Sequence, residues 1–258
     1  MGRRMTVRQL LVTGWDWEPS IIFGCALLAM GYAAIVRKQG LARAPYFLAG
    51  VFLLLLDLVS PLDTLGDQYL FSAHVLQHFF LALVIPPLLL LGVPRWFAIA
   101  AMDRPAIRKV ERAIGHPPVS WLLGVGVMLA WHIPVLFNAA LANDTLHIFQ
   151  HLTFLVTGTI FWWPILSAVE SRRLPALGAV AYLFSACLCC SLLGAFLTFA
   201  PVGLYPAYLH APASGLFGLD PQSDQQLGGL LMWVPGCFVY LTGILASVRR
   251  WYGNEATA

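Results

Sequence analysis

The amino-acid sequence predicts an all-α, polytopic membrane protein with seven transmembrane helices in a single domain, residues 1–258. Hydrophobic residues make up 59% of the chain and charged residues only 10%, whereas a soluble domain carries about 25% charged residues. The mean hydropathy is +0.77. The apolar residues form stretches of about 20, the length that crosses a bilayer as a helix. We therefore expect a lipid bilayer around the chain, and the net charge of +3 requires no nucleic-acid partner.

Seven apolar stretches give the predicted spans. They are residues 20–37, 45–61, 69–93, 119–138, 145–168, 176–200 and 226–248. The connections are short apart from a basic loop at residues 94–118 and a Pro/Gly-rich loop without Lys or Arg at residues 201–225. Prolines lie inside the third, fifth and seventh spans, where we expect them to kink the helices.

Lysine and arginine residues predict the orientation of the chain. The loops after spans one, three and five, together with the C-terminus, hold twelve of the fifteen basic residues, and the loops after spans two, four and six hold none. The twelve are Arg37, Lys38, Arg43, Arg95, Arg104, Arg108, Lys109, Arg112, Arg172, Arg173, Arg249 and Arg250. Since cytoplasmic loops are enriched in basic residues, we expect the N-terminus outside and the C-terminus inside. The three arginines of the N-terminal tail oppose this arrangement but are outnumbered.

Five of the seven histidines fall at one predicted depth. The word His-x-x-Gln-His occurs twice, as His74–His78 and His147–His151, and residues four apart share one helix face. With His132 at the end of span four, all five lie within roughly 15 Å of the outer boundary at 1.5 Å per residue. Imidazole is the commonest metal ligand, and polar groups in hydrocarbon usually mark function. We therefore predict one or two adjacent metal positions, with hydrogen-bonded polar packing as the alternative.

The same two words belong to a longer repeat. Pro61 precedes His74 by thirteen residues, and Pro134 precedes His147 by thirteen residues. The shared pattern, Pro-x12-His-x-x-Gln-His, suggests that spans 2–3 and 4–5 are parallel repeats. A chance match at this short length is the alternative.

Other side chains are candidates for additional ligands or for partners of the ligands. They are Met232, Asp57, Asp63, Asp67, Gln77, Gln150, Asp224 and His210. The two glutamines could orient imidazoles or join helices, and the Met232 thioether could bind Cu(I) or simply pack. Cys187, Cys189 and Cys190 cluster within span six, where they suit either apolar packing or a copper relay.

Ligand chemistry leaves three classes of function open. Imidazoles suit copper, zinc, iron and nickel. A zinc hydrolase would need an open metal position and an acid or base, for which Asp57, Asp63 or Asp224 could serve. A haem-binding electron carrier would also use histidines on facing helices. The chain has no nucleophile elbow or phosphate loop, and we assign no catalytic residue.

Several motifs together resemble a known family. They are Ser60-Pro61-Leu62-Asp63, His74-x-x-Gln77-His78, Pro86-Pro87-Leu-Leu-Leu-Leu-Gly92-Val-Pro94, Trp131-His132-x-Pro134, His147-x-x-x-His151, Phe161-Trp162-Trp163-Pro164 and Asp224-Gln-Gln-x-Gly228-Gly229-x-x-Met232-Trp233. In this order, from about residue 45 to 245, the chain resembles the CtaG family of bacterial assembly factors for caa-type cytochrome c oxidase.

The resemblance has functional implications. It implies a seven-span protein of the bacterial cytoplasmic membrane that aids copper insertion into the oxidase, at the copper B centre. A metal-binding assembly factor is favoured over an enzyme, and the sequence leaves enzymatic activity open. The implied partner is an oxidase subunit or a copper carrier protein. The sequence leaves open the oxidation state of the metal, the number of metal positions and whether the chain forms a homo-oligomer.

Overall fold

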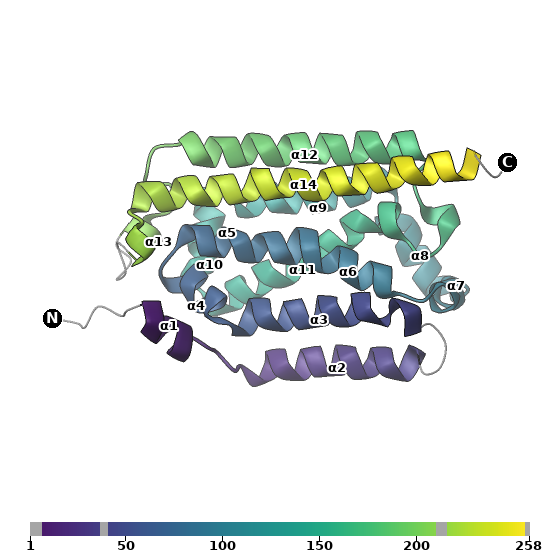
Figure 1. Cartoon of the computed structure of the whole chain (residues 1–258), viewed down its shortest axis with the longest axis horizontal. Helices are drawn as coiled ribbons and strands as arrows, with labels where there is room; N and C mark the ends of the chain where they lie inside the picture. The colour runs from purple at the N-terminus through teal and green to yellow at the C-terminus, as the bar shows by residue number, and fades with distance from the viewer. Residues whose placement is uncertain (1–6, 37–40, 210–215, 256–258) are drawn as a thin grey trace.

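The computed structural model describes residues 7–36, 41–209 and 216–255, and this part of the chain is helical without any β-strand (Figure 1). The α-helices are α1 (Val7–Thr13), α2 (Pro19–Val36), α3 (Ala44–Val59), α4 (Pro61–Gln68), α5 (Phe71–Phe79), α6 (Ile85–Gly92), α7 (Arg95–Met102), α8 (Pro105–Ile114), α9 (Pro117–Trp131), α10 (Pro134–Leu141), α11 (Asp144–Leu166), α12 (Ala176–Phe199), α13 (Pro206–Leu209) and α14 (Pro221–Glu255). A π-helical segment, η2 (Phe80–Val84), joins α5 to α6, and 3-10 turns lie at Leu41–Arg43, Glu170–Arg172 and Leu216–Gly218.

The long helices run side by side along the longest axis of the molecule (Figure 1). α12 and α14 pack together most extensively, and α14 also contacts α5. α11 lies between α9 and α6, while α3 packs on α6 and α2 packs on α3. The apolar core is continuous through these helices and includes Phe71, Phe154, Trp162 and Leu183.

The described helices include five candidate membrane spans by length and composition. They are Pro19–Val36, Leu41–Val59, Phe71–Gly92, Ala176–Phe199 and Pro221–Gly253. A sixth results if α8 and α9, which are bent by 65°, are taken together. α11 is 23 residues long but carries two histidines, a glutamine and four threonines, and is not among these candidates. The structure thus supports a multi-pass membrane protein, while the count of seven spans stays a prediction.

Predicted span four ends earlier than expected. α9 stops at Trp131, and His132 and Ile133 connect it to the separate helix α10. The ring of Pro134 disfavours helical backbone at the preceding residue, and Ile133 accordingly has an extended conformation, with φ −64° and ψ 124°. The prediction of one helix over residues 119–138 is therefore wrong at its outer end. This break makes His132 the C-cap residue of α9, directly after its last helical residue.

The two copies of the repeat adopt the same local structure. Pro61 and Pro134 each begin an eight-residue helix, α4 and α10 respectively. α5 and α11 begin ten residues after those prolines, and His74 and His147 are each the fourth residue of their helix. Duplication of the whole unit stays a prediction.

The prolines of span three produce a π-helical turn rather than a break. Pro86 has no N–H to donate to the carbonyl of Ala82. That carbonyl lies against α11 at Gly158, where an added Cβ would be 2.6 Å from the oxygen. The run from Phe71 to Gly92 stays helical throughout, and Pro164 and Pro235 likewise lie within continuous helices.

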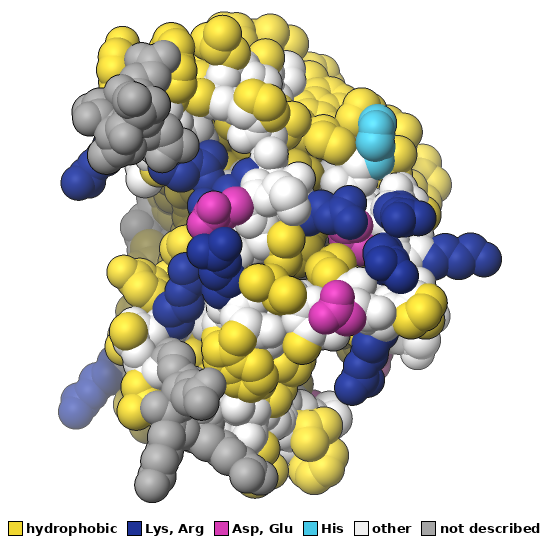
Figure 2. Space-filling view, turned by 90° about the vertical axis from the view of Figure 1, so that its right-hand side faces the viewer, with side chains coloured by type: hydrophobic (Ala, Val, Ile, Leu, Met, Phe, Trp, Pro, Cys, Tyr) yellow, Lys and Arg dark blue, Asp and Glu magenta, His cyan; other side chains and the backbone are white. Residues whose placement is uncertain are grey.

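The basic segment at residues 94–118 is helical, which corrects its prediction as a loop. α7 and α8 occupy most of it, and α8 places Ile107, Val110 and Ile114 on one side and basic residues on the other. Figure 2 shows this end of the molecule, on which many Lys and Arg side chains are exposed. Ion pairs tie the segment to the 3-10 turn after α11, namely Arg95–Glu170 and Arg172–Glu111, both 3.3 Å.

We predict that α12 and α14 depend on glycine for their close approach. A Cβ on Gly229 would meet the Thr198 hydroxyl and lie 2.6 Å from the Thr198 backbone nitrogen. Gly229→Ala should therefore lower the free energy of unfolding by about 1–3 kcal/mol, measured by thermal or denaturant unfolding in detergent. Gly31→Ala on α2 is the matched control, because its added Cβ would meet nothing within 4 Å. Equal stability of the two variants would contradict the packing described.

Candidate metal centre

The five histidines predicted as ligands lie together near one end of the bundle. α5 carries His74 and His78, His132 follows α9, and α11 carries His147 and His151. Four of the side chains are buried, and the His147 side chain is 13% exposed. The i, i+4 spacing turns each pair to one face, with ring centroids 4.2 Å apart for His74 and His78 and 4.1 Å for His147 and His151.

Contacts between the helices join these rings into one cluster. The His74 ring lies 5.3 Å from that of His147 and 6.1 Å from that of His151. The His78 ring lies 5.5 Å from that of His151 and 6.2 Å from that of His132. His78 therefore contacts its own partner His74, the second pair through His151, and His132.

Three of the imidazoles are close enough to share one ion. One nitrogen each from His74, His147 and His151 all lie within 4.8 Å of one another. Nitrogens that each bind one ion at about 2 Å must come within about 4 Å of one another, so small side-chain rotations would close this group around a metal. We call His74, His147 and His151 the histidine triad.

Most nitrogens of the cluster have no hydrogen-bond partner among the described residues. Neither ring nitrogen of His78 has a hydrogen-bond partner, and the same holds for Nε2 of His132 and of His151. The His147 Nε2 forms no hydrogen bond but lies 3.4 Å from the Asp67 carboxylate. The His74 ring lies near the Gly66 backbone and the Gln150 side chain, but neither contact has hydrogen-bond geometry. A buried polar atom without a partner costs roughly 1–3 kcal/mol. Five such residues in contact with one another therefore provide a set of lone pairs that suits a metal ion.

The tautomer of His132 follows from its one hydrogen bond. Its Nδ1 lies 2.7 Å from the carbonyl oxygen of Met128, so Nδ1–H must donate there. Nε2 then carries the lone pair, and it is buried without a partner. This arrangement is typical of an imidazole that is oriented for metal binding by its second nitrogen.

Asp67 lies beside the histidine triad, as an additional ligand would. Its Oδ1 is 3.4 Å from Nε2 of His147 and 3.8 Å from Nδ1 of His74. Burial, followed by the nearby carboxylates of Asp63 and Asp144, raises the pKa of Asp67 to about 8. A bound cation would favour the ionised carboxylate.

Asp57, Asp63 and Gln77 form a separate group. The Gln77 amide nitrogen donates to Oδ1 of Asp63 at 2.6 Å and to the backbone carbonyl of Asp57 at 3.1 Å. The Asp57 carboxyl group is buried without a partner in the described structure. Burial raises the pKa of Asp63 to about 6, although the bond from Gln77 opposes that rise. Gln77 thus bonds to the Asp63 carboxylate and to a backbone carbonyl. Gln150 is fully buried beside His74 and forms no hydrogen bond through its side-chain amide within the described residues.

Asp224 caps a helix. Its two carboxylate oxygens accept bonds from the backbone N–H groups of Phe71, at 2.7 Å, and Ser72, at 3.1 Å. These are first-turn donors of α5, which need partners from outside the helix. The adjacent Gln225 donates to the carbonyls of Leu197 and Ala200 at the end of α12. Asp224 therefore positions the helix that carries His74 and His78.

Aromatic side chains that the sequence analysis did not single out enclose the cluster. The buried ring of Phe137 in α10 lies 4.8 Å from that of His74, and Phe154 lies 4.3 Å from His78. The Tyr205 hydroxyl donates to the carbonyl of His132, and that of Tyr208 donates to the carbonyl of Gly66. These two hydrogen bonds hold the segment after α12 against the backbone beside the cluster. His210 follows this segment but lies outside the described residues.

The sulfur-containing residues extend from the cluster into the bundle. Met232 and Cys190 are buried, and the Cys190 thiol lies 3.6 Å from the carbonyl of Met232. The Cys187 sulfur lies 3.0 Å from that of Cys237 on α14, a residue that the sequence cluster did not include. Cys189 is half-buried. The contact between Cys237 and α12 follows from the packing of the helices, and no local sequence pattern indicates it.

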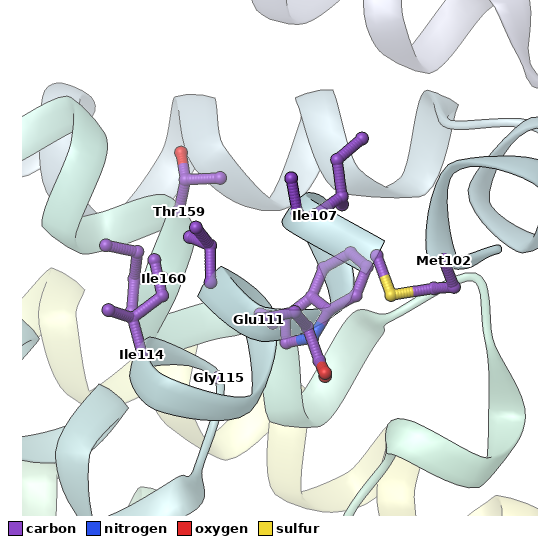
Figure 3. A pocket seen from close by; sticks show the side chains of 10 residues that line it. Met102, Ile107, Glu111, Ile114, Gly115, Thr159 and Ile160 are labelled. Carbon is purple, nitrogen blue, oxygen red and sulfur yellow. The ribbon is translucent and has the colours of Figure 1, made fainter. Parts of the chain in front are cut away.

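A cavity of about 430 Å³ lies apart from this centre (Figure 3). It lies between α8 and α11 and is lined by apolar residues such as Ile107, Ile114 and Ile160. Its carboxylate, Glu111, pairs with Arg172 and accepts a bond from Trp163. Because its lining contains no histidine or cysteine, the histidine cluster stays the candidate metal centre.

Comparisons with known proteins identify one family. A family model described as "Cytochrome c oxidase caa3 assembly factor (Caa3_CtaG)" matches residues 26–254. An uncharacterized protein of Mycobacterium leprae is 27% identical over 263 residues, and uncharacterized proteins of Mycobacterium bovis and Mycobacterium tuberculosis are each 26% identical over 265 residues. These alignments cover 93% of this chain but 40% of each relative, so the chain spans about two fifths of their length. No solved structure matches the chain.

We predict that the Asp224 cap stabilises α5. Asp224→Ala would leave two buried N–H groups without acceptors, and we expect the free energy of unfolding to fall by about 1–3 kcal/mol. Asp103→Ala is the matched control, since Asp103 is exposed in the connection between α7 and α8, and it should change stability by less than about 0.5 kcal/mol. Denaturant unfolding in detergent compares the two. A fully stable Asp224→Ala variant would reject the capping role.

Proposed function

The chain belongs to the family of cytochrome c oxidase caa3 assembly factors, and we propose that it binds copper through His74, His78, His132, His147 and His151 and aids insertion of that copper into the copper B centre of the oxidase. The observation that carries this proposal is the cluster of five contacting imidazoles, most of whose nitrogens form no hydrogen bond within the described residues. Copper is the cargo, which an oxidase subunit or a copper carrier protein would exchange with this chain.

The donor set supports copper as the metal. Imidazole binds both copper and zinc, but Cu²⁺ is bound more tightly than Zn²⁺ by a given set of nitrogen and oxygen ligands. The cluster offers more imidazoles than the four ligands of a tetrahedral site. The surplus would let an ion exchange one imidazole for another on its way to a partner without losing all its ligands at once.

A zinc hydrolase is the second candidate, because Asp67 lies beside the histidine triad. Three histidines and a nearby carboxylate are the parts that a catalytic zinc site needs. Elemental analysis after competition between copper and zinc, on protein purified without a polyhistidine tag, separates the candidates. Zinc retained alone under reducing conditions, with cleavage of an amide or ester, would favour the hydrolase. Haem is less favoured, because the cavity beside the cluster has a volume of only about 30 Å³.

The proposed location is the bacterial cytoplasmic membrane, with seven spans. The histidine cluster and the end that gathers the basic residues lie at opposite ends of the bundle (Figure 1, Figure 2). A basic end that faces the cytoplasm would place the histidines near the outer face. Self-association of the chain stays open.

We predict a cytoplasmic C-terminus and an external N-terminus, because twelve of fifteen basic residues lie in segments assigned to the cytoplasmic side. Reporter fusions at the C-terminus and in the segment between α12 and α14 test the orientation. A C-terminal reporter that is active only outside the cell would overturn both the orientation and the external position of the histidines.

We predict that His74→Ala and His147→Ala leave an inserted protein that no longer supports oxidase maturation. Loss of one ligand should lower copper affinity about 10-fold or more, whereas helix packing rests on many apolar contacts. Copper content of the purified variants and of the oxidase from cells carrying them are the measurements. The expected oxidase retains haem but lacks copper at its buried centre.

His116→Ala is the matched control, because His116 precedes α9 at the basic end of the bundle, far from the cluster. It should support normal oxidase copper. Normal oxidase copper in His74→Ala and His147→Ala would reject the ligand assignment. Loss of either variant from the membrane would instead support a purely structural role for the cluster.

A further inference from the structure

A small cavity lies on the inner side of the histidine triad. Its volume is about 30 Å³, and its lining comes from α5, η2, α9, α11, α12 and α14, together with His132. His78 lies one helical turn beyond His74 in α5, and Met128 lies one turn before His132 in α9, so the cavity extends from the cluster toward the middle of the bundle. A space of this size holds a single ion or water molecule.

The lining brings nitrogen and sulfur donors to one place. His78 and His132 line the cavity with Met128, Met232 and Cys190. Both histidines are more than nine-tenths buried, and the available nitrogens of both lack partners in the described structure. The bond from His132 to the Met128 carbonyl leaves the lone pair on Nε2. Two imidazoles with lone pairs and three sulfur-containing side chains thus line a mostly apolar space of ionic size.

This donor set differs in kind from that of the histidine triad. The triad combines three imidazoles with the Asp67 carboxylate, and no sulfur atom belongs to it. Thioether sulfur is a soft, neutral ligand that favours Cu(I), whereas imidazole and carboxylate also accept Zn²⁺ and Cu²⁺. Thioethers bind without losing a proton, so a monovalent ion could be held here without creating a buried anion.

We infer that this cavity is a second metal position, selective for Cu(I) and formed by His78, His132 and Met232 with Met128 and Cys190 beside them. The inference rests on the proposed function, because it gives the copper a place to go after the triad. The ring of His78 lies 4.2 Å from that of His74 and 5.5 Å from that of His151. Cu(I) would pass between the positions by ligand exchange, with no electron transferred and no bond formed other than those to the metal.

The two positions together would select for the metal. A divalent ion such as Zn²⁺ would be held by the triad but would find in Met232 and Met128 neutral thioethers, which are weak ligands for it. Cu(I) would be held at both positions. The cavity therefore distinguishes copper from its chief competitor by donor type.

The test uses the full-length chain, purified without a polyhistidine tag and titrated with Cu(I) under anaerobic, reducing conditions. Competition with a chromophoric Cu(I) chelator gives the stoichiometry, and X-ray absorption at the copper edge distinguishes sulfur from nitrogen ligands. We expect two Cu(I) ions per wild-type chain, with sulfur scattering. Met232→Leu should bind one ion with nitrogen and oxygen ligands and lose most of the sulfur signal.

Two further variants keep the test decisive. Met30→Leu is the matched control, because Met30 is 59% exposed on α2, and it should behave as wild type. His147→Ala should show the reverse of Met232→Leu and retain the sulfur-ligated ion. Leucine and methionine have similar volumes, so Met232→Leu should fold.

The possible failures can be told apart. One Cu(I) ion with only nitrogen and oxygen ligands, unchanged by Met232→Leu, would overturn the second position and leave the proposed function intact. No Cu(I) bound by wild type at any concentration that the chelator permits would overturn the proposed function itself. A sulfur signal that survives Met232→Leu but is lost in Cys190→Ser would replace the methionine by the thiol as the main sulfur ligand and reject the role of Met232.

Discussion

Burial of five imidazoles among apolar helices is the constraint to which the surrounding structure is adapted, because a polar group removed from water without a partner costs free energy. The backbone N–H and carbonyl groups at the helix ends around the cluster find their hydrogen-bond partners within the chain. Asp224 bonds the first N–H groups of α5, and Gln225 bonds the last carbonyls of α12. The imidazole nitrogens are mostly left unbonded. The helix ends beside the cluster are therefore paired inside the protein, whereas most imidazole nitrogens have no hydrogen-bond partner among the described residues.

Irregular backbone occurs next to the cluster and helps to set its geometry. Pro134 ends α9 at His132, which frees that residue to turn toward His78. Pro86 cannot donate to the carbonyl of Ala82, which lies one turn beyond His78, and the π-helical segment Phe80–Val84 includes this position. Such segments occur frequently at functional sites. The same residues that disturb the helices thus bring histidines from three segments to one level.

The two ends of the bundle have opposite chemistry. The end with the histidines also holds Asp57, Asp63 and Asp67, and it is covered by Tyr205 and Tyr208. The other end carries the arginines and lysines, including those of the amphipathic helix α8 (Figure 2). A cation at the cluster would favour the ionised form of the nearby carboxyl groups, while basic side chains favour the cytoplasmic side of a membrane. This division agrees with a protein that takes up a cation near its outer face.

The sequence by itself determined the helical, membrane-spanning class, the five clustered histidines and the family, because hydropathy, i, i+4 spacing and ordered motifs are local properties of the chain. The sequence placed most membrane-spanning helices within a few residues, but it did not predict the break after Trp131 or the helices α7 and α8. A proline can either kink or end a helix, and a basic amphipathic segment can be either a loop or a surface helix. Only the tertiary structure decided that Asp224 caps α5 while Asp67 joins the triad, that Phe137 and two tyrosines enclose the rings, and that Met232 and Cys190 share a cavity with His78. Those pairings join residues up to 154 positions apart, and no local pattern specifies which side chains meet when separate helices pack.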